Sequence, residues 1–143
     1  MIMGQQGAPG PIGDILRARS TRLLVLGALA CPFALSAILK LGDWPSAVLE
    51  AGGLVPQAPV LVAASTIAVQ LIGSILLFSR RFCWLGAGAL SVFTAIATLM
   101  AHAFWTAHGP ERAHQLATFL EHIAIIGGFA AAAILVNGQA KSP

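Results

Sequence analysis

Four long apolar stretches alternate with short polar segments along the chain. Each stretch is close to the roughly 20 residues that a helix needs to cross a bilayer, and nearly every charged residue lies between or outside them. The predicted spans cover residues 23–41, 59–78, 84–105 and 116–136. This pattern predicts an all-α integral membrane protein, a four-helix bundle that forms a single domain over residues 1–143.

The polar segments predict how the spans are connected. Residues 1–20 are rich in Gly and Pro at their start and predict a flexible or interfacial N-terminal tail. In the first outer loop, Asp43 is a good helix N-cap and Pro45 suits an early helical position. We therefore expect a short interfacial helix over Pro45–Ala51. The tryptophans that lie near span ends, where indole rings anchor helices at headgroup depth, are Trp44, Trp84 and Trp105.

Composition supports a membrane protein and argues against nucleic acid as a partner. The chain is 57% hydrophobic and 9% charged, whereas a soluble domain carries about a quarter charged residues. The net charge is +3, but the basic residues stand at span ends and form no patch in the sequence. We expect the lipid bilayer as a partner and no nucleic acid.

The positions of the basic residues predict the orientation. One predicted side carries Arg17, Arg19, Arg22, Arg80, Arg81 and Lys141. The other side has only Lys40 and Arg112. Because positive charge is enriched in cytoplasmic segments, we expect a multi-pass membrane protein with both termini in the cytoplasm.

Polar side chains with useful chemistry gather toward the predicted outer face. An ionisable side chain within the apolar zone is costly and usually faces the bundle interior or a cavity. The third span runs outward and the fourth runs inward, so His102 and His122 can face each other, and Thr98 can share the helix face of His102. We predict one polar pocket, lined by Lys40, Gln70, His102, Glu121 and His122.

Two interpretations of this pocket stay open. It is either a site for a quinone head group, a small polar ligand or a proton relay, or a set of interhelical hydrogen bonds that hold the bundle. We expect no metal and do not favour haem, because the chain has no haem attachment motif, no H-E-x-x-H and no dense Cys/His set. We assign no catalytic residue.

Four short segments carry a recognisable combination of motifs: Ala101–Trp105 (AHAFW), Phe119–Phe129 (FLEHIAIIGGF), Leu39–Leu41 (LKL) and Arg80-Arg81. Together they resemble the DoxX family of small four-span membrane proteins, and the resemblance extends over roughly Leu23–Val136. The family commonly carries a Glu in the second span, where this chain has the neutral Gln70.

The resemblance implies a multi-pass protein of a bacterial inner (plasma) membrane and a place in membrane oxidoreductase systems. Relatives accompany other proteins in such systems, thiosulfate:quinone oxidoreductase among them. We therefore expect an accessory or anchoring subunit of a larger quinone-linked or electron-transfer complex, with other membrane subunits as partners and a quinone as candidate cofactor. Catalysis by the chain alone is not implied. The alternatives are a structural or assembly protein without chemistry and, less favoured, a small-ligand transporter.

Overall fold

The computed structural model describes residues 8 and 10–139, and these residues form helices and no strand. Four of the helices are long and apolar enough to cross a membrane. The predicted all-α fold with four candidate spans is therefore confirmed. The helices are α1 (Gly10–Arg17), α2 (Arg19–Gly42), α3 (Trp44–Leu54), α4 (Pro59–Leu77), α5 (Cys83–Ala101) and α6 (Gly109–Gln139).

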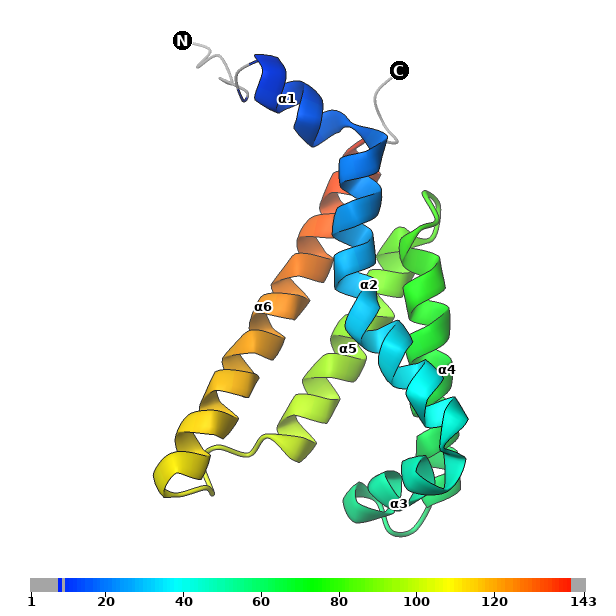
Figure 1. The fold of residues 1–143 in the computed structure, drawn as a ribbon, viewed down its shortest axis with the longest axis vertical. Coiled ribbons are helices and arrows are strands. Elements are labelled where there is room, and N and C mark those ends of the chain that lie inside the picture. Colours follow the sequence, from blue (N-terminus) through cyan, green and yellow to red (C-terminus); the bar gives the residue numbers. More distant parts are fainter. Residues whose placement is uncertain (1–7, 9, 140–143) are drawn as a thin grey trace.

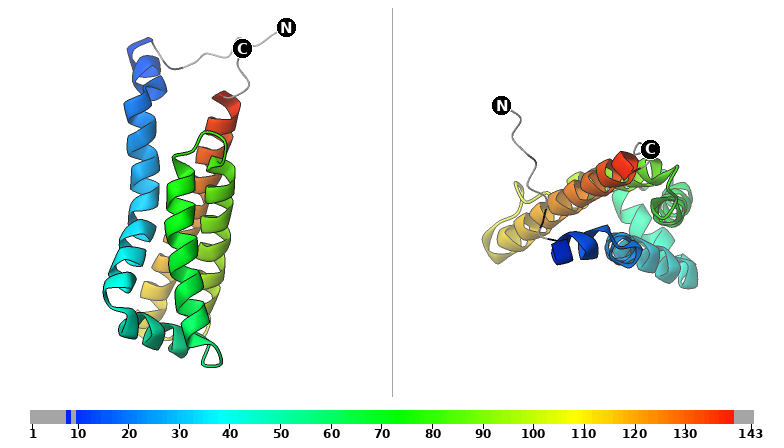
Figure 2. Two further views of the ribbon diagram at one scale, coloured as in Figure 1. Left: turned by 90° about the vertical axis from the view of Figure 1, so that its right-hand side faces the viewer. Right: turned by 90° about the horizontal axis from the view of Figure 1, so that it is seen from above.

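The four long helices pack in the order α2, α4, α5, α6, and α2 returns to touch α6 over a short stretch. Figure 1 shows that α2 and α6 lie close together at the end of the bundle that holds α1 and separate toward the end that holds α3. Figure 2 shows α3 lying across the ends of the long helices. We call these two ends the α1 end and the α3 end.

The apolar core explains why α2 and α6 meet mainly in one half of the molecule. Leu26, Ala30 and Phe33 of α2 are buried in one cluster with Phe129 and Ala132 of α6. The Phe33 and Phe129 ring centroids lie 5.4 Å apart. These residues belong to the first part of α2 and the last part of α6, so the core closes the α1 end.

The helices α4 and α5 approach each other closely beside the turn that joins them. A Cβ atom on Gly86 would lie 2.7 Å from the Gly73 carbonyl oxygen and 2.9 Å from the Leu77 backbone nitrogen. Small residues permit such close approach between membrane helices. The two glycines therefore set the distance between the half of the molecule formed by α2, α3 and α4 and the half formed by α5 and α6.

At the α3 end, two span boundaries differ from the prediction by a helical turn or more. The third helix ends at Ala101 and does not continue to residue 105, because His102 has non-helical dihedral angles (φ −123°, ψ 55°). Phe104 and Trp105 then turn back, and both pack edge-on against Phe119 of α6. These two apolar side chains therefore pack on α6 and do not extend the helix α5.

The fourth helix begins at Gly109, well before the predicted residue 116. Gly109 has a positive φ of 59°, and Pro110 follows at a position where proline suits a helix start. With 31 residues, α6 is about 46 Å long, which exceeds the roughly 30 Å of a bilayer core. Its polar first turns are helical as well, and hydropathy alone does not detect them.

The connection between α2 and α4 is helical. The expected helix over Pro45–Ala51 lies within α3, which begins at Trp44 and ends at Leu54. The Asp43 carboxylate accepts a hydrogen bond from the Ser46 backbone N–H at 3.2 Å, as the N-cap prediction requires. Ala47 and Ala51 pack with Ala63 of α4 in a small second core, so α3 is fixed against the bundle.

Candidate functional site

Two histidines predicted to face each other do so at the α3 end. His102 caps the end of α5, and His122 lies on α6. Their ring centroids are 5.2 Å apart, with the ring planes inclined at 65°. Both side chains are half-buried. We call these two residues the histidine pair.

The hydrogen bond from His122 defines its protonation pattern. Thr98, buried on α5, donates its hydroxyl proton to the Thr94 carbonyl oxygen at 2.6 Å. The Thr98 hydroxyl oxygen itself lies 2.7 Å from Nδ1 of His122. A hydroxyl has a single proton to donate, so when Thr98 donates to Thr94, Nδ1 of His122 is the donor in the second bond. In this arrangement neutral His122 carries its proton on Nδ1, and its Nε2 is a proton acceptor.

His102 is oriented in the same way by α6. Its Nδ1 lies 2.8 Å from Oε1 of Gln115, and the Gln115 amide nitrogen donates to the Glu111 carboxylate at 2.7 Å. A carboxylate accepts and does not donate when ionised, so Gln115 presents its oxygen to the imidazole. His102 therefore also carries a proton on Nδ1 and has Nε2 as an acceptor when neutral.

An apolar cavity adjoins the histidine pair. It has a volume of about 160 Å³, and His122 and Thr98 line it together with Phe119, Leu99 and Ile123. Leu99 and Ile123 are 57% and 51% exposed, which places them on the surface of the bundle. An imidazole therefore lies beside a cavity that opens on the apolar surface of a candidate span.

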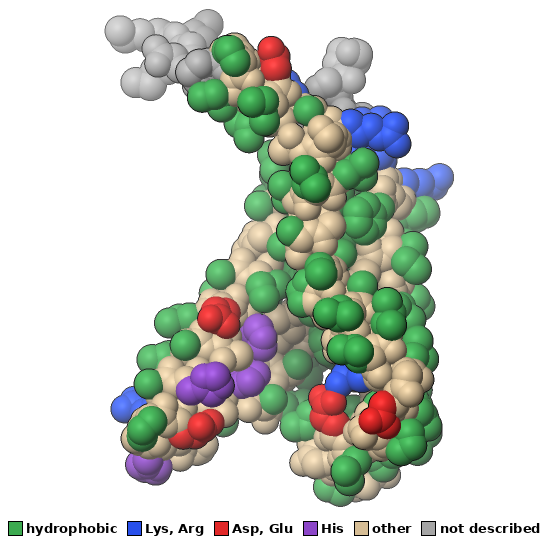
Figure 3. Space-filling view, viewed as in Figure 1, with side chains coloured by type: hydrophobic (Ala, Val, Ile, Leu, Met, Phe, Trp, Pro, Cys, Tyr) green, Lys and Arg blue, Asp and Glu red, His purple; other side chains and the backbone are tan. Residues whose placement is uncertain are grey.

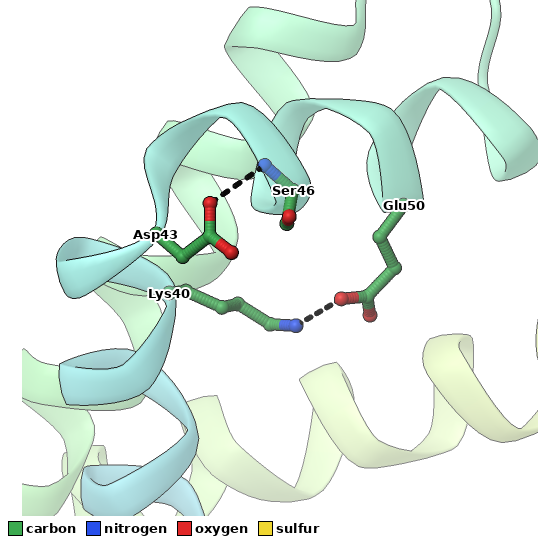
Figure 4. A network of polar contacts seen from close by, with 4 residues as sticks. All are labelled: Lys40, Asp43, Ser46 and Glu50. Carbon is green, nitrogen blue, oxygen red and sulfur yellow. Dashed lines mark hydrogen bonds and ion pairs between the residues drawn. The ribbon is translucent and has the colours of Figure 1, made fainter.

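Lys40 belongs to a different site at the same end. Its ammonium group forms an ion pair with Glu50 of α3, as Figure 4 shows together with the Asp43 cap. These residues line an open cavity of about 680 Å³, whose apolar side includes Leu35 and Leu39 of α2. We call the Lys40–Glu50 pair the lysine–glutamate pair.

The contacts do not connect the five predicted pocket residues into one network. Gln70 is 5% exposed, and its Oε1 finds no hydrogen-bond partner among the described residues. Ser74, one turn further along α4, is also buried without a partner for its hydroxyl among them. Glu121 is exposed. The structure thus brings together His102 and His122, and it places Lys40 with Glu50.

The space-filling view shows the same separation. In Figure 3 the histidines gather on α5 and α6, whereas a basic side chain between acidic ones lies across a hollow on the side of α2 and α3. Among the described residues, no three His, Cys, Asp or Glu side chains are arranged to hold a metal ion. The predicted anchors Trp44, Trp84 and Trp105 are 38%, 54% and 53% exposed.

The sequence prediction does not include the residues that orient His102. Gln115 and Glu111 lie four residues apart, where helical side chains interact. Gln115 also lies seven residues before His122, on the same helix face. This spacing is a signal for Gln115, but it becomes visible only if the helix is extended back to Gly109.

Comparison with known proteins identifies the family. The sequence model of the DoxX family matches residues 23–103, which is more than half of the chain and includes most of α2, all of α3 to α5, and His102. No curated protein and no solved structure shows a significant match. This match shows, in agreement with the four apolar helices, that the chain belongs to the DoxX family.

Proposed function

We propose that the protein is an accessory membrane subunit of a quinone-linked redox complex in a bacterial inner membrane. The histidine pair is its point of contact with the quinone head group. Membership of the DoxX family supports the redox association. The observation that carries the site assignment is the shared orientation of the two imidazoles, each with Nδ1 bound inside the protein and Nε2 available as an acceptor.

The residues fit a quinone head group by their chemistry. A quinone supplies a carrier that takes up two electrons and two protons, and in this proposal the electrons come from a partner subunit. Each imidazole takes a proton from water at Nε2 and donates it toward a carbonyl oxygen of the bound ring. Thr98 and Gln115 hold the Nδ1 protons throughout, so each imidazole exchanges protons at one nitrogen only.

The surroundings of the pair suit a lipid-soluble ligand. Such a ligand reaches the site through the bilayer, and the cavity beside His122 has Leu99 and Ile123 at its exposed side. Ligand sites of this kind combine apolar walls with a few oriented polar groups. Phe119 also lines the cavity, and it offers an aromatic face for ring stacking.

The proposed orientation places the α1 end in the cytoplasm. The described arginines Arg17, Arg19, Arg22, Arg80 and Arg81 flank the spans at this end, as the positive-inside rule requires. The histidine pair and α3 then face the periplasm, with Trp44 and α3 at the interface. The test is a reporter enzyme that works only in the periplasm, fused to the C-terminus. Activity of this fusion would contradict the orientation.

Quinone binding tests the site directly. Trp105 packs against Phe119, with ring centroids 6.3 Å apart, so a quinone in the cavity quenches its fluorescence. We expect a short-chain ubiquinone analogue to quench the purified protein, and His122→Ala to weaken binding about tenfold through the lost hydrogen bond. His114→Ala is the matched control, because His114 is exposed on the same helix. Trp105→Phe identifies the quenched indole.

Co-purification tests the association with a complex. A tagged copy extracted from its native membrane in mild detergent is expected to retain a stoichiometric oxidoreductase or electron-transfer subunit. Recovery of the protein alone would contradict the role as a subunit. It would not affect the quinone-binding assay, so the two parts of the proposal are tested separately.

The hydrogen bond between Thr98 and His122 favours a second candidate, a purely structural role. This bond joins α5 to α6, and such bonds stabilise membrane bundles by about 0.6 kcal/mol on average. If His122→Ala and His102→Ala lower the melting temperature but leave quinone quenching unchanged, the pair acts only in holding the helices together.

A further inference from the structure

Four arginines surround one cavity at the α1 end. Arg17 comes from α1, Arg19 and Arg22 come from the start of α2, and Arg80 comes from the turn between α4 and α5. The cavity has a volume of about 400 Å³, and Phe78 completes its lining. None of these lining residues is acidic. We call this site the arginine cavity.

The corner between α1 and α2 fixes the arginines around the cavity. The chain turns at Ala18, and the Thr21 hydroxyl donates to the Ile15 carbonyl oxygen at 2.6 Å across the turn. The Arg17 side chain donates from Nε to the Gly13 carbonyl oxygen at 3.1 Å. The Thr21 bond holds α1 against the start of α2, and the Arg17 bond holds the Arg17 side chain along α1, although like charges at close range repel each other.

Arg22 lacks an acceptor for one of its donors. Its Nε is fully buried and has no hydrogen-bond partner among the described residues. A buried charged donor without an acceptor is costly, and bidentate pairing with a phosphate is the geometry that a guanidinium favours. The arginine cavity therefore has the charge and the donors for a phosphate group.

An apolar groove continues from the same arginine. Arg22 also lines a cavity of about 180 Å³ between α2 and α6, whose walls include Leu16, Val25 and Leu135. Leu16 and Ile15 of α1 are both 62% exposed. A short helix with exposed apolar side chains beside basic ones lies at the boundary between headgroups and acyl chains, which is the depth of a lipid phosphate.

We propose that the arginine cavity and this groove together bind one anionic phospholipid. Its phosphate lies between Arg22 and Arg80, and one acyl chain lies along Val25 and Leu135. Basic pockets between transmembrane helices are suited to such headgroups. The proposal concerns the end of the molecule opposite the histidine pair and does not depend on the proposed function.

Native mass spectrometry of the purified full-length protein tests this proposal. The probes are phosphatidylglycerol and phosphatidylcholine with identical acyl chains, added in a neutral detergent. We expect the protein to retain phosphatidylglycerol and to lose phosphatidylcholine. Arg22→Gln and Arg80→Gln are each expected to weaken its binding about fivefold, as for one basic residue near a membrane surface. Arg81→Gln removes the same charge outside the cavity, where Arg81 stacks on Phe82, and is expected to change little.

Folding is controlled within the same experiment. Arg80 is exposed in a turn, so Arg80→Gln is expected to keep the helix content and melting profile of the unchanged protein. Val25→Phe fills the groove without placing a polar group in lipid. It is expected to weaken binding of phosphatidylglycerol while keeping the preference over phosphatidylcholine.

Four outcomes would overturn the proposal. Equal losses in Arg80→Gln and Arg81→Gln would indicate diffuse charge attraction, and equal retention of phosphatidylcholine would exclude headgroup recognition. Displacement of the lipid by equimolar inorganic phosphate would identify a site for a soluble anion. Unchanged lipid binding in Arg22→Gln together with loss of a co-purified protein would identify a surface for a partner's acidic segment.

Discussion

The histidine pair and the lysine–glutamate pair lie at the same end of the molecule but are organised in different ways. Each imidazole has its Nδ1 hydrogen bonded inside the protein and keeps Nε2 as an acceptor, and His122 lines an apolar cavity. Lys40 and Glu50 instead form an ion pair at the edge of an open cavity that both residues line, and the Glu50 side chain is 62% exposed.

The charges of Lys40 and Glu50 are satisfied within the pair, which connects the end of α2 to α3. Nε2 of each histidine has no hydrogen-bond partner among the described residues, and in our proposal this free acceptor binds a ligand. The two regions therefore differ in how their polar groups are satisfied, and the following predictions test whether they are independent.

The largest expected effect comes from the close contact between α4 and α5, the helices that connect the halves of the molecule carrying the two regions. Gly86→Ala places a Cβ against the backbone of α4 at Gly73 and Leu77, and neither backbone atom can move without separating the helices. We expect a loss of about 1–3 kcal/mol in the free energy of unfolding, measured by denaturation of the detergent-solubilised protein. The histidine pair and the lysine–glutamate pair should both become disordered at the same lower denaturant concentration.

Gly88→Ala is the matched control, because a Cβ on Gly88 meets nothing within 4 Å. Alanine is the better helix former, so this variant should be no less stable than the unchanged protein. Equal stability of the Gly86→Ala and Gly88→Ala variants would mean that α4 and α5 are not held at the close distance described.

The next effect is confined to the histidine pair. Thr98→Val keeps the shape of the side chain but removes the acceptor of the Nδ1 proton of His122. The imidazole then loses its fixed orientation, and we expect quinone binding to weaken about tenfold, as for one lost hydrogen bond. Quenching of Trp105 measures this, and Thr106→Val is a control because Thr106 is exposed and bonds only to the local carbonyl of Ala103.

A smaller effect is expected at the lysine–glutamate pair. A pair exposed to this degree is worth about 0.2–1 kcal/mol. A double-mutant cycle with Lys40→Met and Glu50→Gln should therefore give a coupling energy in this range that decreases with added salt. Quinone quenching should change less than twofold. If Lys40→Met weakens quinone binding as much as His122→Ala does, the two regions form the single pocket that the sequence predicts.

Hydropathy was sufficient to predict the four long helices. A segment that crosses lipid must satisfy its backbone hydrogen bonds internally, so a long apolar stretch forms a helix. The antiparallel order of the last two spans was also sufficient to place His102 opposite His122. The partner of Lys40 was not predictable in this way. Glu50 reaches it only because Ala47 and Ala51 dock α3 on α4, a tertiary contact that local sequence does not encode.

Aromatic residues after α5 show why span ends are hard to predict. Phe104 and Trp105 are apolar enough to extend a span, yet they pack on Phe119 outside the helix. The polar start of α6 has the opposite problem, since Glu111 and Gln115 are helical without being apolar. These two deviations occur beside the histidine pair, so the sequence indicated Thr98 but not Gln115 and Glu111, which orient His102.

The smallest expected effect is a pH dependence at the start of α3. Hydrogen bonds from the Ser46 side chain and from its backbone N–H lower the pKa of the Asp43 carboxyl below its usual value near 3.9. Because the pKa is lower in the folded state, the cap stabilises α3 fully above about pH 4. This contribution is lost as the pH falls through the lowered pKa. Fluorescence of Trp44 in a Trp84→Phe/Trp105→Phe background should report a transition below pH 4.

Asp43→Asn distinguishes this cap from the neighbouring ion pair. Asparagine also caps helices well but does not titrate, so the transition below pH 4 should disappear while α3 stays folded at neutral pH. Glu50→Gln removes the other nearby carboxylate and should leave the transition in place. If Glu50→Gln abolishes it instead, α3 is held at low pH by the lysine–glutamate pair, and that pair contributes more to the α3 end than its exposure indicates.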